Sequence, residues 1–337
     1  MPNKEKEIIQ SFLSQLPTNK HLKNNFFESD AEIIEFGYDK LLFTTDEFSS
    51  EDLFRDHDPQ ILDWNLAVCT ISDILASGGK PLFYGHSVQI SKQWDQDFLE
   101  KFSKGIASVL EQSKSGFIGG DLGLSEEWRY TGICLGTTEK PLSRKGTLPE
   151  EAIYMTGKAG AGNLEAALVM YSDHYPLNKL CNSYQARFPL RIKESHLISK
   201  YASCCIDTSD GILNALNTIA ELNNVGYIIS MLPYSKEGKM ACKIISKPIE
   251  ILFMGECGEY ELLFTIKKSI EKKFIDESKK KHLHFTKIGE VTSKDYKMLS
   301  SNKSEIQFND FDIYARNFEN VSDYISELIN YLKNNKK

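Results

Sequence analysis

The chain has 337 residues, of which 41% are hydrophobic and 26% are charged, and its formal net charge is −7 with a sequence pI near 5.6. This length favours two domains of roughly 150 residues each, with the composition of a soluble globular protein. The negative charge argues against a general nucleic-acid binder and against a protein that docks on an acidic membrane.

The same sequence argues against export and membrane insertion. No apolar run reaches the roughly 18 residues that a membrane span requires, and the N-terminus lacks the apolar core of a signal peptide. The seven cysteines form no CxxC pair, which is typical of free thiols in a reducing compartment. We therefore expect a cytoplasmic protein without a membrane segment.

Hydrophobic periodicity predicts an N-terminal domain in which strands and helices alternate. The strongest local signal is Asp58-Pro59, an N-cap followed by proline at the first helical position, and the double glycine Gly78-Gly79 ends that helix. After a first helix over residues 5–16, we expect the pattern β-β-α-β-α-β-β, an α+β arrangement. Its elements are strands near 30–34 and over 41–46, a helix over 59–77, a strand over 82–90, a helix over 95–113, a strand into a double-glycine turn at 119–121, and a strand over 129–136.

Two irregular stretches divide the chain. Residues 47–57 are polar and are predicted to form a substrate loop. Residues 139–151, rich in charge and in proline and glycine, are the predicted domain boundary.

Beyond this boundary we expect strands over 152–156, 201–206, 226–231, 260–266 and 284–291, with helices over 157–168 and 320–332. The Lys-rich stretches 271–281 and 333–337 are interpreted as solvated surface.

The stretch from Cys205 to Leu213 carries the clearest chemical signal. An apolar strand ends in Asp207 and Asp210, and Gly211 then opens an amphipathic helix. Backbone N–H groups at such a helix N-terminus favour a phosphate, and Ser209 is a candidate cap. Two carboxylates beside a phosphate usually imply a hard cation such as Mg²⁺. On this stretch alone, a helix cap with two solvated acids remains an equal alternative.

Asp73 is the second candidate metal ligand. It lies within an otherwise apolar helix of small residues, and a buried carboxylate must be paired or bind a metal ion. The glycine-rich turn at 157–162 is not a Walker loop, because its lysine follows the first glycine and no Lys-Ser/Thr pair closes it.

Four segments share an Asp beside Gly, Ser or Thr: Thr44-Thr45-Asp46, Ser72-Asp73, Gly119-Gly120-Asp121 and Asp207-Thr208-Ser209-Asp210-Gly211. Three further segments follow in a matching order: Leu142-Ser143-Arg144-Lys145-Gly146, Tyr154-Met155-Thr156-Gly157 and Glu261-Leu262-Leu263-Phe264-Thr265. Together, over residues 28–293, they resemble the thiamine-monophosphate kinase family of the aminoimidazole-ribonucleotide synthetase superfamily.

The resemblance implies an α/β (α+β), two-domain aminoimidazole-ribonucleotide synthetase-like fold. Residues 1–140 would bind ATP and Mg²⁺ and pair their sheet across a homodimer, and residues 147–337 would form a C-terminal α/β domain. It also implies an ATP- and Mg²⁺-dependent kinase of thiamine biosynthesis, whose small acceptor is thiamine monophosphate or a related phosphorylated compound. No catalytic residue distinct from the metal ligands is implied, because phosphoryl transfer depends on positioning and charge neutralisation.

The resemblance carries over a set of site residues. The implied metal ligands are Asp30, Thr45, Asp46, Asp73, Asp121, Asp207 and Asp210. The implied ATP contacts are Gly120, Asp121, Arg144 and Ser209. The candidate acceptor contacts are His57 and Glu259.

Departures from the family pattern leave two alternatives open. Ser29 stands where the family's first motif has an aspartate, the loop after Asp46 lacks the expected histidine, with His57 nearby, and one acid is missing beside Glu259. A superfamily synthetase or ligase that activates a carbonyl oxygen with ATP is one alternative, although no nucleophile motif is visible. A non-catalytic nucleotide-binding homologue is the other.

Overall fold

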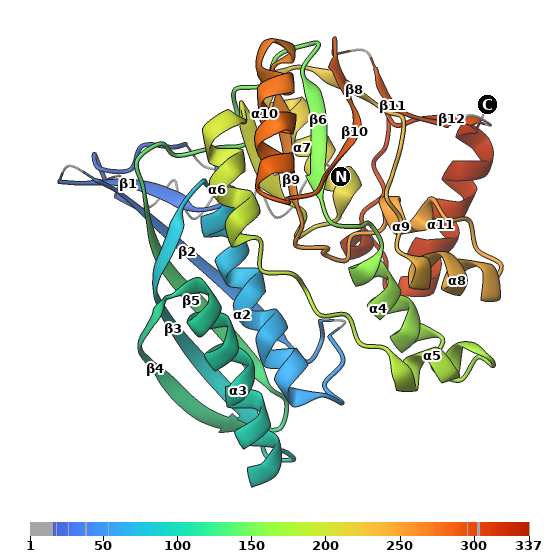
Figure 1. Ribbon diagram of the computed structural model, residues 1–337. Coiled ribbons are helices and arrows are strands. Elements are labelled where there is room, and N and C mark those ends of the chain that lie inside the picture. The colour runs from blue at the N-terminus through green and yellow to red at the C-terminus, as the bar shows by residue number, and fades with distance from the viewer. Residues whose placement is uncertain are drawn as a thin grey trace.

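The computed structural model describes residues 16–336 apart from Thr18, Phe26, Tyr38, Leu53, Asp295, Asn302 and Lys303. It contains two mixed α/β units, each built on one sheet (Figure 1). Nearly all of the helix expected over residues 5–16 falls outside the described residues. Within the described ranges, no helix combines the length and apolar character needed to cross a membrane. The predicted two-domain α/β fold is confirmed.

The N-terminal unit has the expected β-β-α-β-α-β-β order. Its five strands are arranged β1-β2-β5-β3-β4 across the sheet, with β1 and β2 forming an antiparallel hairpin. The helices α2 and α3 pack against each other and cover one face (Figure 1). The elements are β1 (Glu32–Phe36), β2 (Asp39–Ser49), α2 (Pro59–Ala76), β3 (Lys80–Ser91), α3 (Gln96–Ser113), β4 (Gly116–Ser125) and β5 (Arg129–Thr138).

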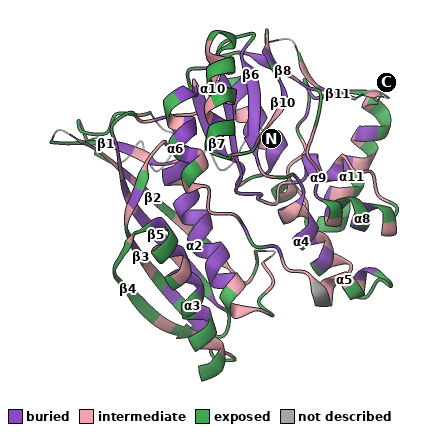
Figure 2. Ribbon diagram, viewed as in Figure 1, coloured by how far each residue is buried: buried purple, intermediate pink, exposed green. Residues whose placement is uncertain are grey.

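Helix α2 is the central element of this unit. The side chain of Asp58 accepts hydrogen bonds from the backbone N–H groups of Gln60 and Ile61, and Pro59 occupies the first turn, as predicted. Nearly the whole helix is buried, and Figure 2 shows it as mostly buried, in contrast to the largely exposed edge strand β4. It is buried because it contacts α3 and the sheet on one side and the C-terminal unit on the other.

One expected turn is wrong. Gly119-Gly120-Asp121 lies in the middle of β4 and does not form a loop. A Cβ on Gly120 would lie 2.2 Å from the carbonyl oxygen of His86, so the glycine permits β4 to pair closely with β3. Gly120 therefore serves strand pairing, which a turn-like sequence pattern cannot reveal.

Asp63 is a buried carboxylate at the contact between α2 and α3. One of its oxygens accepts the backbone N–H of Ile106 at 2.7 Å, while the other has no hydrogen-bond partner among the described residues. Burial raises the pKa of this carboxyl to about 8. The charged form is thus disfavoured in the folded protein.

We expect Asp63→Asn to remove a pH-dependent loss of stability. A carboxyl whose pKa is about 3.9 when unfolded and about 8 when folded binds more protons in the folded state. The free energy of unfolding then falls as pH rises through this window, by up to about 1.4 kcal/mol per pH unit. Denaturant unfolding of wild type and Asp63→Asn at pH 5.5 and 7.5 should show the variant gaining roughly 2–3 kcal/mol relative to wild type. Parallel pH profiles would contradict this assignment.

The C-terminal unit is built on a seven-stranded sheet with the order β12-β11-β8-β10-β6-β9-β7. Its strands are β6 (Ala152–Thr156), β7 (Cys204–Asp207), β8 (Gly226–Ile229), β9 (Leu262–Ile266), β10 (Phe285–Thr292), β11 (Lys297–Ser301) and β12 (Ser304–Gln307). Its helices are α4 (Ala161–Met170), α5 (Leu177–Ser183), α6 (Ile192–Tyr201), α7 (Ile212–Asn223), α8 (Lys236–Ile244), α9 (Ile251–Met254), α10 (Lys268–Lys280) and α11 (Val321–Asn335), with a 3₁₀ turn, η1 (Ala315–Asn317).

The central strands of this sheet are buried on both faces, so they read as continuous apolar runs. In β6, Ile153 and Met155 join a core that includes residues of α7, α9 and α11, whereas Ala152 and Tyr154 join a core with residues of α6 and α10. The Lys-rich stretch 271–281, interpreted as surface, belongs mostly to helix α10, whose Phe274 is buried in the second of these cores. Its lysines lie on the exposed face, which concealed the short apolar stripe.

The two units meet along α2. The indole N–H of Trp64 donates to the carbonyl of Phe188 at 2.7 Å, and the amide of Asn65 donates to the carbonyl of Ala186 at 2.8 Å. Both acceptors lie between α5 and α6. The C-terminal half of α2 also contacts β7 and α6. This junction brings the end of β7 close to the acidic residues of the N-terminal unit.

Candidate metal and nucleotide site

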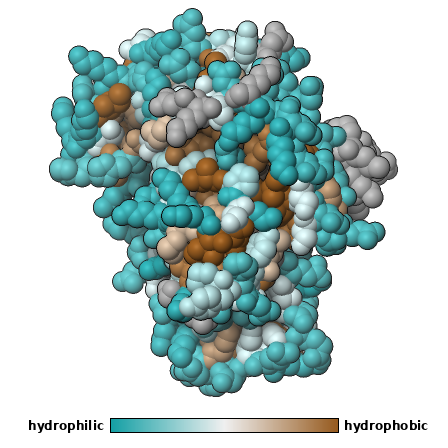
Figure 3. All heavy atoms as spheres, turned by 90° about the vertical axis from the view of Figure 1, so that its right-hand side faces the viewer, coloured by the Kyte–Doolittle hydropathy of each residue, from teal (hydrophilic) through white to brown (hydrophobic). Residues whose placement is uncertain are grey.

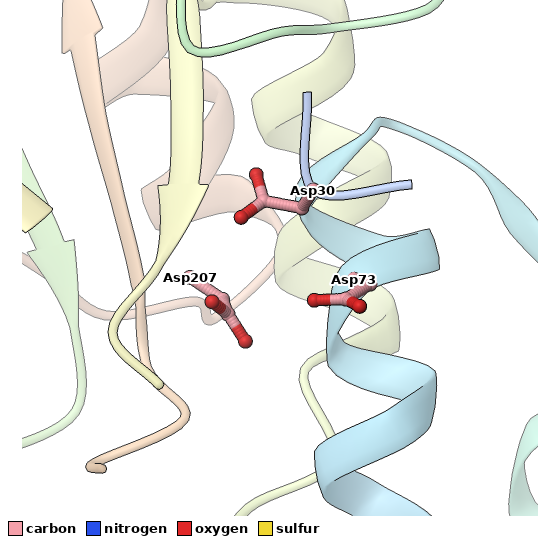
Figure 4. A group of neighbouring side chains, drawn as sticks. All are labelled: Asp30, Asp73 and Asp207. Carbon is pink, nitrogen blue, oxygen red and sulfur yellow. The ribbon is translucent and has the colours of Figure 1, made fainter. Parts of the chain in front are cut away.

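Three predicted ligands gather at this junction. Asp30 precedes β1, Asp73 lies near the end of α2, and Asp207 is the last residue of β7. A carboxylate oxygen from each lies within 4.8 Å of the others, and Figure 4 shows the side chains converging on one space from three different segments. Oxygens at these separations can share one divalent cation, because Mg²⁺ and Ca²⁺ take oxygen ligands at about 2.0–2.6 Å.

Neighbouring groups fix the orientation of each carboxylate. The hydroxyl of Thr44 donates to Asp73 Oδ2 at 2.5 Å, and the hydroxyl of Ser72 donates to Asp207 Oδ2 at 2.6 Å. The Arg144 guanidinium donates to Asp30 Oδ1 through two nitrogens, at 2.8 and 3.1 Å. Such hydrogen bonds to metal ligands preorganise a site. Sequence reasoning missed Thr44 and Ser72 as orienting groups, although each adjoins a predicted ligand.

The electrostatics of the cluster favour a cation. Burial, followed by repulsion from neighbouring aspartates, raises the pKa of Asp46 to about 7 and that of Asp73 well above its usual range. Burial and repulsion from Asp30 raise the pKa of Asp207 to about 6. One buried oxygen of Asp30 and one of Asp46 have no hydrogen-bond partner within the described residues. Crowded carboxylates with unpaired oxygens fit a divalent cation, which would supply the missing interactions.

The cluster lies in a cleft of about 840 Å³ between the two units. Acidic residues greatly outnumber the two arginines, Arg144 and Arg316, in its lining. Eight of the predicted site residues line it: Asp30, Thr45, Asp46, Asp73, Arg144, Asp207, Ser209 and Asp210. Four residues of the predicted substrate loop, Glu47, Glu51, Asp52 and Phe54, also line it, as do Glu32 and Glu256, which were not predicted as site residues.

The N-terminus of α7 adjoins the cleft, because Ser209 and Asp210, which lead into the helix, line it. Its first turn contains no acidic residue, and its N-cap residue, Gly211, has no side chain that could cap it. Ser209 therefore does not act as the expected helix cap; its backbone N–H donates to Asp207 Oδ1 at 3.3 Å. Gly211 has a φ of 82°, and a Cβ there would lie 2.3 Å from the carbonyl oxygen of Gly255. Only glycine fits this turn, which leads directly from Asp210 into the helix.

In a single chain, Asp121 lies apart from the acidic cluster of Asp30, Asp73 and Asp207. Cross-strand pairs place Asp46, Gly132, His86 and Gly120 on the face covered by the helices. Asp121 is one residue further along β4, so its side chain points to the opposite face of the sheet. Asp121 is exposed, and neither it nor Gly120 lines the cleft. Their assignment as ligand and ATP contact stays a prediction.

The two candidate acceptor contacts also lie outside the lining of the cleft. His57 is exposed, just before α2. Glu259 is buried, and its carboxylate accepts the backbone N–H groups of Gly160 and Ala161, at 2.8 and 2.6 Å, where α4 begins. This arrangement gives Glu259 an anchoring position at a helix N-terminus. A substrate contact by either residue is untested.

Ser29, which stands where the family motif has an acidic residue, lies in a buried position suited to a hydroxyl group. It is buried, and its hydroxyl lies 3.2 Å from that of Ser77 and donates to the carbonyl of Leu142 at 3.4 Å. A carboxylate at this position would face a carbonyl oxygen. The neighbouring Asp30 still reaches the acidic cluster, so the substitution removes one charge and leaves the remaining carboxylates together.

The predicted substrate loop is joined to the C-terminal unit by a buried ion pair. Arg55 donates to the two carboxylate oxygens of Glu165, on α4, at 2.5 and 2.9 Å, and to the carbonyl of Cys181 at 2.8 Å. Only 12% and 5% of the two side chains are exposed. The pair holds the loop residues Glu51, Asp52 and Phe54 against the cleft that they line.

A small apolar pocket adjoins the cleft. It has a volume of about 110 Å³, lies between α4, α8 and α11, and shares Glu256, Cys257 and Ala315 with the cleft. Figure 3 shows a hydrophobic area surrounded by hydrophilic side chains on the side of the molecule where these helices lie. The cleft therefore has acidic walls and an apolar neighbour.

The two units match two family models in order. Residues 28–138 match the model described as AIR synthase related protein, N-terminal domain, and residues 149–299 match AIR synthase related protein, C-terminal domain. The first match covers the sheet β1–β5, and the second covers β6–β10 and the start of β11 in the other sheet.

Two curated relatives of the chain are both named thiamine-monophosphate kinase. The chain is 30% identical over 264 residues to a thiamine-monophosphate kinase of Aquifex aeolicus, which covers 76% of this chain and 86% of that protein. It is 29% identical over 279 residues to one from Pyrococcus abyssi, covering 81% and 86%. A solved structure, "AaThiL complexed with AMPPCP and TMP", superposes with a TM-score of 0.72 at 25% identity, covering 88% of this chain and 92% of that chain.

Proposed function

The chain belongs to the thiamine-monophosphate kinase family of the AIR synthase related proteins, and we propose that it transfers the γ-phosphate of ATP to thiamine monophosphate in an Mg²⁺-dependent reaction. As an ATP-dependent kinase it would supply a phosphorylated product to thiamine biosynthesis. The observation that carries the proposal is the convergence of Asp30, Asp73 and Asp207 in a cleft beside the open N-terminus of α7.

The chain's own residues would hold the reactants through charge. Asp30, Asp46, Asp73, Asp207 and Asp210 are the proposed Mg²⁺ ligands. The metal, when bound, neutralises phosphate charge and polarises the γ-phosphoryl group. The uncapped backbone N–H groups at the start of α7 would receive phosphate oxygens.

Arg144 has two roles in this proposal. It orients Asp30 through the two hydrogen bonds described above, and it lines the cleft, where its positive charge suits an ATP phosphate. Ser209 and Arg144 are thus the proposed nucleotide contacts within one chain.

The charge of the cleft supports a cationic acceptor. Beyond the metal cluster, the carboxylates of Glu51, Asp52 and Glu256 line the cleft together with one basic side chain, Arg316. Thiamine monophosphate carries a permanently positive thiazolium ring, which such carboxylates would attract. Its phosphate would instead be held with that of ATP at the metal cluster.

We propose that the protein is located in the cytoplasm, because its free thiols suit a reducing compartment.

A panel of acceptors tests the proposal. Purified protein is given ATP and Mg²⁺ with thiamine monophosphate, thiamine, other phosphorylated metabolites, or no acceptor, and ADP and products are quantified by chromatography. ADP formed in equal amount to thiamine diphosphate supports the proposed reaction. ADP formed with a dephosphorylated or ligated product would indicate a synthetase, and ATP binding without consumption would indicate a non-catalytic homologue.

We also propose that the protein is a homodimer, assembled through β4. This strand is at the edge of its sheet, pairs only with β3 among the described strands, and exposes Phe117, Ile118, Leu122 and Leu124, with 49–68% of each exposed. Apolar edge strands are usually covered by a partner. Any contribution of Asp121 to a site in the neighbouring copy would depend on this assembly.

The dimer predicts a clear response to charge on β4. Leu122→Lys combined with Leu124→Lys should convert a dimer to a monomer, because four buried lysines would face each other near the interface. Light scattering at micromolar concentration measures the mass. Leu148→Lys, at an exposed leucine away from β4, is the matched control and should remain dimeric. A wild-type protein that is monomeric would contradict the proposal.

A further inference from the structure

A second large groove lies at the junction of the two units. Its volume is about 1210 Å³, and none of its lining residues also lines the acidic cleft. One wall is formed by the start of β3, the end of α3 and the segment after β5; the other is formed by α6 and the end of α10. The groove therefore has a rigid wall from each unit.

The charge of this groove is opposite to that of the protein as a whole. The chain carries a formal charge of −7, yet Glu139 is the one acidic residue in the groove's lining, which also contains His196. Six exposed lysines from both units line it: Lys80, Lys114, Lys140, Lys193, Lys200 and Lys281. A local basic surface on an acidic protein concentrates anions.

These lysines have few acidic partners of their own. Lys200 pairs with Glu277 at 2.6 Å, but the other five form no ion pair with any residue that the structure describes. Their ammonium groups are therefore available to a ligand. Flexible lysine stems allow several of them to reach one anion in the groove.

The favourable interaction of cations with helix C-termini explains only some of the six lysines that line the groove. Lys114, Lys200 and Lys281 are near the C-terminal ends of α3, α6 and α10, where a cation interacts favourably with the helix dipole. Lys193, however, is in the first turn of α6, where the dipole disfavours a cation, and Lys80 and Lys140 lie outside helices. Their common feature is the groove.

We propose that this basic groove binds a small anion that carries two or more phosphate groups, at a site separate from the metal and nucleotide cleft. A single phosphate contacts too few of the lysines, which are contributed by five segments around a space of about 1210 Å³. A linear polyphosphate can contact lysines on both walls at once. Because these contacts are exposed to solvent, binding should weaken as salt increases.

The test is a calorimetric titration of inorganic tripolyphosphate into the full-length protein at low salt with EDTA present. Without a metal ion, the carboxylates of the acidic cleft repel this anion, so the heat reports on the groove. We expect saturable binding of one anion per chain to wild type. The triple variant Lys114→Gln, Lys140→Gln and Lys193→Gln should weaken it about tenfold or more.

The control is a triple variant with the same change of net charge, Lys104→Gln, Lys239→Gln and Lys333→Gln, at exposed lysines outside the groove. It should bind as wild type does, and so should Asp207→Asn, which alters only the cleft. Unchanged melting temperatures confirm that the variants fold. These measurements are made without ATP turnover, so they remain informative if the proposed kinase reaction fails.

Four results would overturn the proposal: no binding to wild type, equal weakening in the two triple variants, equal affinity for orthophosphate and tripolyphosphate, or altered binding by Asp207→Asn. Preferential binding of an RNA oligomer over tripolyphosphate at equal phosphate concentration would also overturn it, because it would assign the groove to a macromolecule.

Discussion

Replacing Asp73 by Asn is expected to lower kcat/KM by about 10³-fold or more without unfolding the protein. Loss of a ligand carboxylate removes several kcal/mol of charge stabilisation from the phosphoryl-transfer transition state. In EDTA, the same change relieves repulsion among Asp73, Asp30 and Asp207, whose oxygens lie within 4.8 Å. The free energy of unfolding of the metal-free variant should therefore equal or exceed that of wild type.

Asp63→Asn is the matched control for this experiment. It removes another buried carboxylate from the same helix, but Asp63 faces α3 and does not line the cleft. Its activity should remain within about twofold of wild type, consistent with a structural position. If Asp73→Asn instead lowers the melting temperature and leaves both activity and Mg²⁺-ATP affinity unchanged, Asp73 is a structural residue and the shared metal site is wrong.

Replacing Glu165 by Gln is expected to lower the free energy of unfolding by about 3–5 kcal/mol. The substitution keeps the shape of the side chain but leaves the guanidinium of Arg55 buried without its carboxylate. Arg55 retains carbonyl partners at Cys181 and Tyr184, which cannot neutralise its charge. Denaturant unfolding of the variant and wild type measures the loss.

A double-mutant cycle identifies the pair as the cause. Arg55→Met alone should also destabilise the protein, whereas Arg55→Met with Glu165→Leu should recover much of the loss, because an apolar pair leaves no buried charge. The variants should also raise KM for the acceptor, since the pair holds the loop that lines the cleft. Additive losses of stability in the double variant would show that the two side chains are not coupled.

The N-terminal fold could be predicted because its signals are local. The alternation of strand and helix periods, the cap at Asp58 and the double glycine after α2 each specify one element boundary. Glycines inside β4 mimicked a turn because the reason for Gly120, close approach to the His86 carbonyl, exists only after two strands pair. Helix α10 was missed because its apolar stripe is short among many lysines.

The site residues also divide into those that local motifs predict and those that only the folded structure reveals. Asp30, Asp73 and Asp207 stand in recognisable motifs, and the structure brings their carboxylates together. The face on which Asp121 lies depends on strand register, which changes with a shift of one residue and is invisible in a short motif. The partners Arg55 and Glu165 are 110 positions apart, so no local pattern relates them.

Calorimetric titration of a non-hydrolysable ATP analogue with and without Mg²⁺ measures whether the acidic cleft binds ATP through the metal ion. The basic groove is separated from this measurement by use of the triple variant Lys114→Gln, Lys140→Gln and Lys193→Gln. We expect the affinity for the analogue to fall about 100-fold or more when Mg²⁺ is removed, because phosphates and carboxylates then repel each other. Equal affinity in both conditions would contradict this expectation.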